Sequence, residues 1–229
     1  MLVGQHMRPG VGNNSHAVLL VQSDVADLDT TFTDTSRGGA LHTVNGRGGI
    51  AHSTTQSQFA GSSIRFQAAR WIDIADSVDF TLGGADWTIE GWMRADVVAS
   101  QTLMGQADFP NTDVAERILF AASGRIYGVA SLNGTVMIVA AGAAGVVGAT
   151  AWTHMMLQRR GDVLSSYSNG LLTASAAIVG SVHDSSLSLY LGRYSAGAQQ
   201  FTGYMEEVRI TTGLARYPEA GFTPPNRMN

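Results

Sequence analysis

Apolar and polar residues alternate with a period of two along much of the chain, which is the pattern of half-buried β-strands. In Asp86–Arg94, this alternation places four residues on one side of the expected strand: Trp87, Ile89, Gly91 and Met93. We expect that side to pack into a core. Helical periodicity is short wherever it occurs, and the sequence predicts only a single helical turn, over Gly213–Tyr217.

Glycine-containing turns separate the expected strands in the middle of the chain. Between Ile118 and Leu172 there are four such signals: Ser123-Gly124, Asn133-Gly134, Arg160-Gly161-Asp162 and Asn169-Gly170. Asn-Gly accepts the positive φ angles that tight hairpins require, so the region predicts an antiparallel meander. Arg160-Gly161-Asp162 is also an adhesion triplet, but we interpret it as an ordinary hairpin turn. Repeated short strands with turns at this spacing indicate an all-β sandwich or barrel.

Composition is consistent with one globular, turn-rich domain. The 229 residues include 27 glycines and only 14% charged residues, against roughly 25% in average soluble domains. The net charge is −4, and all the basic residues are arginines scattered along the chain, so we expect no nucleic-acid partner. Cysteine is absent, which excludes disulfides and thiolate chemistry.

The start of the sequence does not resemble a secretory signal. Arg8 and Pro9 stand where a secretory signal needs an apolar core, and glycines interrupt the longest apolar stretch, so we expect no membrane span and synthesis in the cytoplasm. Residues 1–14 are rich in glycine and asparagine, and they predict an N-terminal arm. Residues 15–229 are predicted to form the folded domain.

One stretch, Phe201–Pro225 (FTGYMEEVRITTGLARYPEAGFTPP), resembles the closing strand of laminin-G-like, concanavalin A-type jelly rolls that recur in bacteriophage virion proteins. Three further blocks resemble the same family in the same order: Thr31–Ser36, Ile72–Trp92 and Trp152–Gly170. The resemblance covers roughly residues 16 to 225. It implies an all-β fold, an antiparallel two-sheet jelly-roll sandwich.

The resemblance also implies a role. It favours a non-enzymatic virion structural protein on the particle surface: a capsid decoration protein or a small head- or tail-fibre component. The expected partners are other virion proteins and copies of the chain itself, as a homo-oligomer or bound to a lattice. The alternative is a carbohydrate-binding adhesin that recognises host surface glycans, and the third possibility is a divergent glycoside hydrolase.

Jelly rolls of this group often hold a structural calcium ion between an early aspartate and a late acidic position. By resemblance, Asp34 and Glu206 are the candidate ligands. Strict alternation in the closing strand places Glu206 in line with Val208 and Ile210, where a carboxylate needs a partner or an ion. The competing interpretation is a salt bridge or hydrogen bond to a neighbouring strand. Calcium needs six to eight oxygen ligands, and the sequence offers two.

Catalytic signals are weak. Retaining glucanases of the concanavalin A type carry an E-x-D-x-E strand, which this chain lacks, and alternation puts Glu206 and Glu207 on opposite faces. We expect His154 to be a packed, hydrogen-bonded residue, because a catalytic histidine needs positioned partners. Five aromatic residues are possible sugar platforms, although alternation does not tell which of them are exposed: Trp92, Tyr127, Tyr167, Tyr190 and Tyr194.

Overall fold

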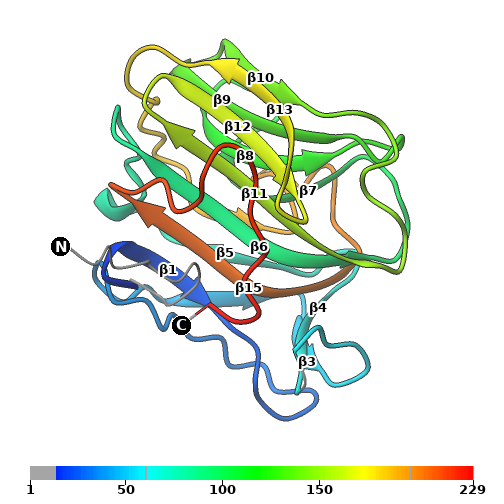
Figure 1. Ribbon diagram of the computed structural model, residues 1–229. Helices are drawn as coiled ribbons and strands as arrows, with labels where there is room; N and C mark the ends of the chain where they lie inside the picture. The colour runs from blue at the N-terminus through cyan, green and yellow to red at the C-terminus, as the bar shows by residue number, and fades with distance from the viewer. Residues whose placement is uncertain (1–13, 60, 196, 229) are drawn as a thin grey trace, which may run out of the picture.

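The protein folds into two antiparallel β-sheets that face each other across one core (Figure 1). The computed structural model describes residues 14–59, 61–195 and 197–228. The expected all-β sandwich is therefore confirmed, with the described helices limited to two 3₁₀ turns, η1 (Asn14–His16) and η2 (Val78–Phe80). The predicted arm, residues 1–14, lies outside the described residues except for Asn14.

One sheet has eight strands, in the order β13-β12-β11-β6-β15-β4-β3, with β1 added alongside β15. The bounds are β13 (Leu171–Ala177), β12 (Val163–Ser168), β11 (Trp152–Arg160), β6 (Trp87–Ala95), β15 (Gly203–Thr212), β4 (Ser63–Phe66), β3 (Ala51–Ser53) and β1 (Ala17–Val21). Strands from both ends of the sequence meet at its centre, because β15 pairs with β6, β4 and β1.

The second sheet has seven strands, in the order β10-β9-β8-β7-β14-β5-β2. The bounds are β10 (Met137–Ala141), β9 (Ile126–Gly134), β8 (Val114–Phe120), β7 (Gln101–Ala107), β14 (Leu189–Leu191), β5 (Trp71–Ile74) and β2 (Val44–Arg47). Every pairing in both sheets is antiparallel, and sequence neighbours β7 to β10 form the meander that the turn signals predicted.

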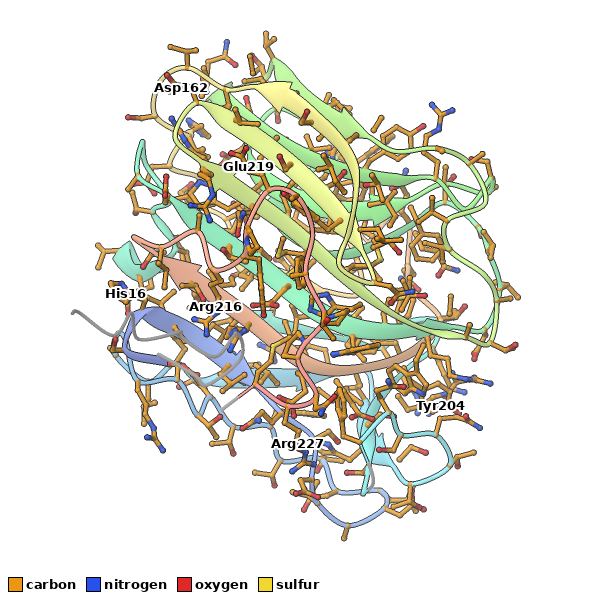
Figure 2. The ribbon with its side chains drawn as sticks, viewed as in Figure 1. His16, Asp162, Tyr204, Arg216, Glu219 and Arg227 are labelled. Carbon is orange, nitrogen blue, oxygen red and sulfur yellow. The ribbon has the colours of Figure 1, made fainter. Side chains whose placement is uncertain are left out.

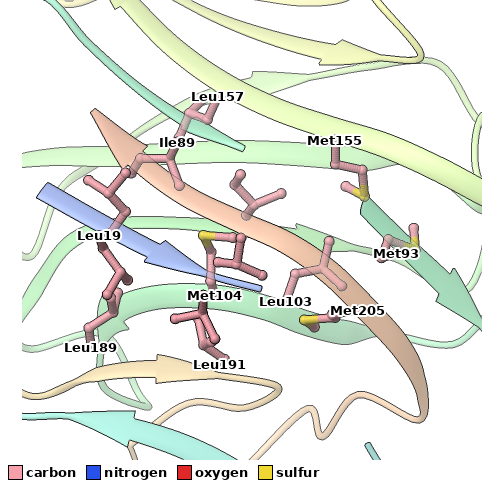
Figure 3. Close-up of a cluster of buried hydrophobic side chains, with 14 of the residues drawn as sticks. Leu19, Ile89, Met93, Leu103, Met104, Met155, Leu157, Leu189, Leu191 and Met205 are labelled. Atoms are coloured by element: carbon pink, nitrogen blue, oxygen red, sulfur yellow. The ribbon is translucent and has the colours of Figure 1, made fainter. Parts of the chain in front are cut away.

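The core fills the space between the sheets (Figure 3). Trp87, Ile89 and Met93 on β6 are buried there, as the alternation of Asp86–Arg94 predicts. Gly91 completes that face and lies against Val208, whose side chain a Cβ at this position would touch at 3.4 Å. Removing this much apolar surface from water is the main favourable term in folding.

The four turn predictions are confirmed, because each turn joins two paired strands. Gly161 and Gly170 have φ angles of 54° and 77°, which glycine adopts without strain. Arg160-Gly161-Asp162 is thus the hairpin between β11 and β12.

The closing strand β15 departs from strict alternation. A β-bulge at Glu207, whose φ is 54°, shifts the register between Glu206 and Arg209. The extra residue turns Val208 into the core, whereas Glu206 lies opposite Trp92 on the outer face, the face turned away from the other sheet. The predicted alignment of Glu206 with Val208 and Ile210 is therefore wrong.

Residues 213–228 form an extended segment, which we call the C-terminal segment, that runs across the outer face of the eight-stranded sheet (Figure 1, red). The predicted helical turn over Gly213–Tyr217 is wrong. The backbone N–H groups of Arg216 and Tyr217 donate to Thr88 Oγ1 and Gln158 Oε1, both at 3.1 Å. These bonds to the sheet take the donors that a helical turn would use.

Candidate functional site

A buried polar cluster lies between the C-terminal segment and the eight-stranded sheet. At its centre, Glu90 on β6 accepts hydrogen bonds from Arg209 Nη2 at 2.6 Å and from the Tyr217 hydroxyl at 2.9 Å. His154 Nε2 lies 3.1 Å from the second carboxylate oxygen, Glu90 Oε2. Burial alone would raise the pKa of Glu90, but the Arg209 charge and the His154 contact outweigh it and lower the pKa to about 2.

The C-terminal segment closes this cluster to ligands. Phe222 stacks on Tyr217 with ring centroids 3.9 Å apart, and Trp92 Nε1 donates to Pro225 O at 3.3 Å. Figure 2 shows Arg216 and Glu219 on this segment where it passes over the sheet. His154 is completely buried, so the prediction that it is a packed, hydrogen-bonded residue is confirmed.

The candidate calcium ligands lie in two separate hydrogen-bond sets. Both carboxylate oxygens of Asp34 accept from backbone N–H groups: Leu20 at 3.0 Å, Ser36 at 2.9 Å and His42 at 3.0 Å. Glu206 accepts from Gln58 N at 2.7 Å. Within residues 14–59, 61–195 and 197–228, no three Asp, Glu or His side chains gather as a metal site would require. The calcium ion stays a prediction.

Glu206 and Glu207 do not form a catalytic pair. Burial raises the pKa of Glu206, whereas Glu207 accepts from Gln22 Nε2 at 2.9 Å and from Met228 N at 2.8 Å. Each carboxylate is therefore buried and bonded to a different part of the chain. Neither is open to a glycosidic bond, which a retaining hydrolase needs between two carboxyl groups about 5 Å apart.

An open groove of about 300 Å³ lies on the outer face of the seven-stranded sheet. Its floor follows from strand register, because Arg117 on β8 pairs with Val129 on β9, which pairs with Val139 on β10. The intervening residues, including Ile118, point into the core. Ten residues line the groove: Phe109, Asn111, Arg117, Leu119, Tyr127, Val129, Met137, Val139, Tyr194 and Gln199.

One wall of the groove is the loop between β7 and β8. Asp108 Oδ1 holds this loop by accepting from the backbone N–H of Thr112 at 2.7 Å and of Asp113 at 2.8 Å. The loop presents Phe109, which is 55% exposed, and Asn111. A compact, internally bonded loop of this kind positions its side chains before a ligand arrives.

Arg117 and Tyr194 meet at the floor. The guanidinium lies over the Tyr194 ring at 4.9 Å and donates to Asn111 Oδ1 at 2.6 Å. Burial raises the pKa of the Tyr194 hydroxyl and lowers the pKa of Arg117. The groove thus combines aromatic surface, amide groups and a buried cation.

The structure separates the five candidate sugar platforms. Trp92 and Tyr167 are buried on the eight-stranded sheet, and both contact the C-terminal segment. Tyr127 and Tyr194 line the groove, and Tyr190 is partly exposed on the same sheet. Four other residues of the groove were not predicted from the sequence: Phe109, Asn111, Arg117 and Gln199. The Pro110-Asn111 pair marks a turn, but only the folded chain brings it beside β8 and Gln199.

The fold defines the class of protein, a lectin-like β-sandwich. The sequence model of the concanavalin A-like lectin/glucanases superfamily, in its laminin G branch, matches residues 66–215, and the chain belongs to this family. The family expected from sequence is therefore confirmed. A search of curated proteins found no match.

Solved structures with the same fold include binding domains of clostridial toxins. The binding domain of paraclostridial mosquitocidal protein 1 aligns with a TM-score of 0.67 and 13% identity, over 89% of this chain and 50% of that one. The binding domain of botulinum neurotoxin DC in complex with SialylT aligns with a TM-score of 0.65 and 11% identity, over 89% and 49%. The chain therefore spans about half the length of these relatives.

These comparisons do not test several expectations. The neighbours reported above are toxin domains, not bacteriophage proteins, so the virion role, the virion partners and the location on the particle surface stay predictions. The same holds for self-association and for the absence of a nucleic-acid partner. In the described part of the chain, no helix has the length and apolar character needed to cross a membrane.

Proposed function

We propose that this protein is a non-enzymatic carbohydrate-binding domain and that its ligand occupies the groove on the outer face of the seven-stranded sheet. The observation that carries the proposal is the lining of that groove. Tyr127 and Phe109 offer partly exposed rings, and Asn111 and Gln199 offer amide groups beside them. A sugar has apolar C–H faces and a rim of hydroxyl groups, so it matches this combination.

The size of the groove suits a small ligand. A volume of about 300 Å³ lies at the lower end of the range for small-molecule sites. Such a volume admits one or two sugar rings at a time, with the rest of a longer glycan in solvent. The outer face of the other sheet is not free for a ligand, because the C-terminal segment covers its central strands.

The lining also supports binding over hydrolysis. None of the ten described residues that line the groove is Asp, Glu or His, so neither a carboxylate pair nor an imidazole faces a bound sugar there as general acid and base. Glu90, the one carboxylate of β6, is fully buried on the other sheet. The glycoside hydrolase alternative therefore has no site in the groove.

The structural neighbours give independent support of a limited kind. One is a neurotoxin binding domain in complex with SialylT, and another belongs to work on cell entry of botulinum neurotoxin type C through two ganglioside molecules. At 10–13% identity these neighbours share the fold with this chain. This chain corresponds to about half of each domain, so its own ligand remains a proposal.

A glycan array followed by calorimetry tests the proposal. Tyr127→Ala removes a ring from the groove and should weaken binding of any sugar found by about tenfold or more, the order expected for a lost aromatic contact. Tyr190→Ala is the matched control, because Tyr190 lies on the same sheet but does not line the groove. No binding on the array at high protein concentration, or equal losses in both variants, would contradict the proposal.

The biological setting expected from sequence, a bacteriophage particle, is compatible with such a domain. A glycan-binding sandwich on a virion surface would act as an adhesin, and a decoration or fibre protein could be built on the same fold. Locating the protein in purified particles by cryo-electron microscopy tests this setting. Density at the tail tip supports host-surface recognition, whereas density on the capsid faces supports decoration.

A further inference from the structure

Arg117 carries a buried positive charge that no carboxylate of the described residues pairs with directly. Three arginines are buried among the described residues: Arg117, Arg159 and Arg209. Arg209 is paired with Glu90 at 2.6 Å, and Arg159 donates to carbonyl oxygens and lies 3.6 Å from Asp162. Arg117 forms no salt bridge with any residue that the structure describes, although it is only 7% exposed.

The hydrogen bonds of Arg117 leave much of its donor capacity unused. It donates to Asn111 Oδ1 at 2.6 Å and to the Met137 sulfur at 3.0 Å, and a thioether is a weak acceptor. Its Nε atom is buried without a hydrogen-bond partner. A guanidinium has five N–H donors, so this side chain is poorly satisfied for a buried cation.

The carboxylate whose charge acts on Arg117 is already engaged. Burial lowers the pKa of Arg117, and the opposing electrostatic effects of Tyr194 and Asp108 offset only part of this shift. The oxygens of Asp108 accept from the backbone of Thr112 and Asp113 and from the Thr112 hydroxyl, so they stabilise the loop. The groove is thus an apolar and aromatic space whose floor carries a cation with no direct ion-pair partner among the described residues. That arrangement favours an anionic group on the ligand.

We propose that the groove takes an acidic sugar and that the carboxylate of this sugar binds the Arg117 guanidinium. This inference rests on the proposed function, since it names the ligand class of the same site. A carboxylate is planar and matches the fork of a guanidinium with two parallel hydrogen bonds. Tyr127 and Phe109 then contact the ring of the sugar, and Asn111 and Gln199 its hydroxyl groups.

Matched ligands test the charge separately from the sugar. The probes are disaccharides ending in glucuronic, galacturonic or sialic acid, each compared by calorimetry with its methyl ester and with a neutral disaccharide. The ester keeps the ring and removes the charge. At least one acid should bind about tenfold or more tightly than its own ester, as expected for a charge-assisted bidentate contact. Raising the salt concentration should narrow this difference.

Variants assign the preference to Arg117. Arg117→Met keeps the length of the side chain and should abolish the difference between acid and ester while leaving the weaker binding of the ester. Arg117→Lys should keep part of the preference, because the charge remains without the fork. The matched control is Arg47→Gln on the same sheet, at an exposed ion pair with Asp73, which should leave the preference unchanged.

The possible failures are distinguishable. Equal affinity for acid and ester, with sugar binding retained, would overturn the acidic-sugar inference and leave the proposed function in place. Binding of sulfated sugars alone would overturn the carboxylate assignment in favour of a sulfate ester. Equal loss of acid and ester binding in Arg117→Met would assign Arg117 a structural role instead. Absence of binding to every disaccharide and to the array would remove the proposed function itself.

Discussion

Tyr217 in the C-terminal segment donates its hydroxyl to Glu90 on β6, 127 positions away in sequence, at 2.9 Å. The acceptor is a fully buried carboxylate that also bonds Arg209. A charge-assisted hydrogen bond therefore joins the C-terminal segment to the middle of the eight-stranded sheet. The bond lies in a buried site, where such bonds are strong.

Removing the Tyr217 hydroxyl should destabilise the fold. In Tyr217→Phe the ring still stacks on Phe222, but Glu90 loses one of its hydrogen-bond donors. The free energy of unfolding should fall by about 2 kcal/mol, the order for a hydrogen bond to a charged group. Urea denaturation measures the change. The matched control is Tyr204→Phe, whose hydroxyl has no hydrogen-bond partner among the described residues, and an equal loss in both variants would contradict the prediction.

The strand pattern shows how much of the fold could be predicted from sequence. Trp87, Ile89 and Met93 face the core as alternation requires, because β6 runs without a bulge. Alternation failed at β15, where a single residue with positive φ, Glu207, reverses which side chains face inward. The buried apolar positions Met205 and Val208 are three residues apart, and that spacing was the signal for the bulge.

The candidate site was harder to predict, since it depends on contacts between distant segments. Tyr127 and Tyr194 could be recognised as aromatic, but the sequence does not show that both line one groove. Arg117 could not be predicted as a site residue, because a single arginine in a strand is usually solvated. Its significance comes from burial without an ion pair, which only tertiary packing reveals. In the same way, nothing local indicates that residues 213–228 cover Trp92 and His154.

Two buried glutamates should give opposite pH dependences. The folded state lowers the pKa of Glu90 to about 2 from its usual 4.5, so its contribution to stability is complete above about pH 4.5 and is lost as the pH falls towards 2. Glu116 has its pKa raised to about 8 because it is desolvated in the sandwich interior. Its contribution is complete below about pH 4.5 and is lost as the pH rises through about 8.

Glu116→Gln isolates the second effect. The amide keeps the shape of the side chain and can still accept the backbone N–H of Gln106, which lies 3.2 Å from Glu116 Oε1. Urea denaturation at a series of pH values should show that the free energy of unfolding of this variant increases relative to that of the parent protein as the pH rises from 5 to 8. Glu90→Gln should instead be less stable than the parent at pH 7, with the difference shrinking as the pH falls to 2. A difference that stayed constant with pH would refute either assignment.

Asp34 should be important for stability whether or not it binds an ion. Three backbone N–H groups converge on its carboxylate, and Asp34→Ala would leave them without this acceptor near the start of the chain. We expect the free energy of unfolding of Asp34→Ala to fall by about 3 kcal/mol, because buried donors are left unsatisfied. The proposed calcium ion adds a second expectation: a chelator should lower the melting temperature and added calcium should restore it. An unchanged melting temperature would rule the ion out and leave the amide contacts as the role of Asp34.

Gly170 should couple the β12–β13 turn to the C-terminal segment. A Cβ at this position would lie 1.7 Å from Phe222 O, and the Phe222 N–H donates to Gly170 O at 2.9 Å. Gly170→Ala therefore has to displace the segment as well as strain the turn. Gly161→Ala is the matched control, since Gly161 also has a positive φ in a hairpin but a Cβ there meets nothing within 4 Å. Gly161→Ala should lower the free energy of unfolding by about 1 kcal/mol, and Gly170→Ala should lower it by distinctly more. Hydrogen exchange at Phe222 checks the mechanism: faster exchange in Gly170→Ala alone supports the coupling, whereas equal exchange in both variants would show that the turn and the segment are independent.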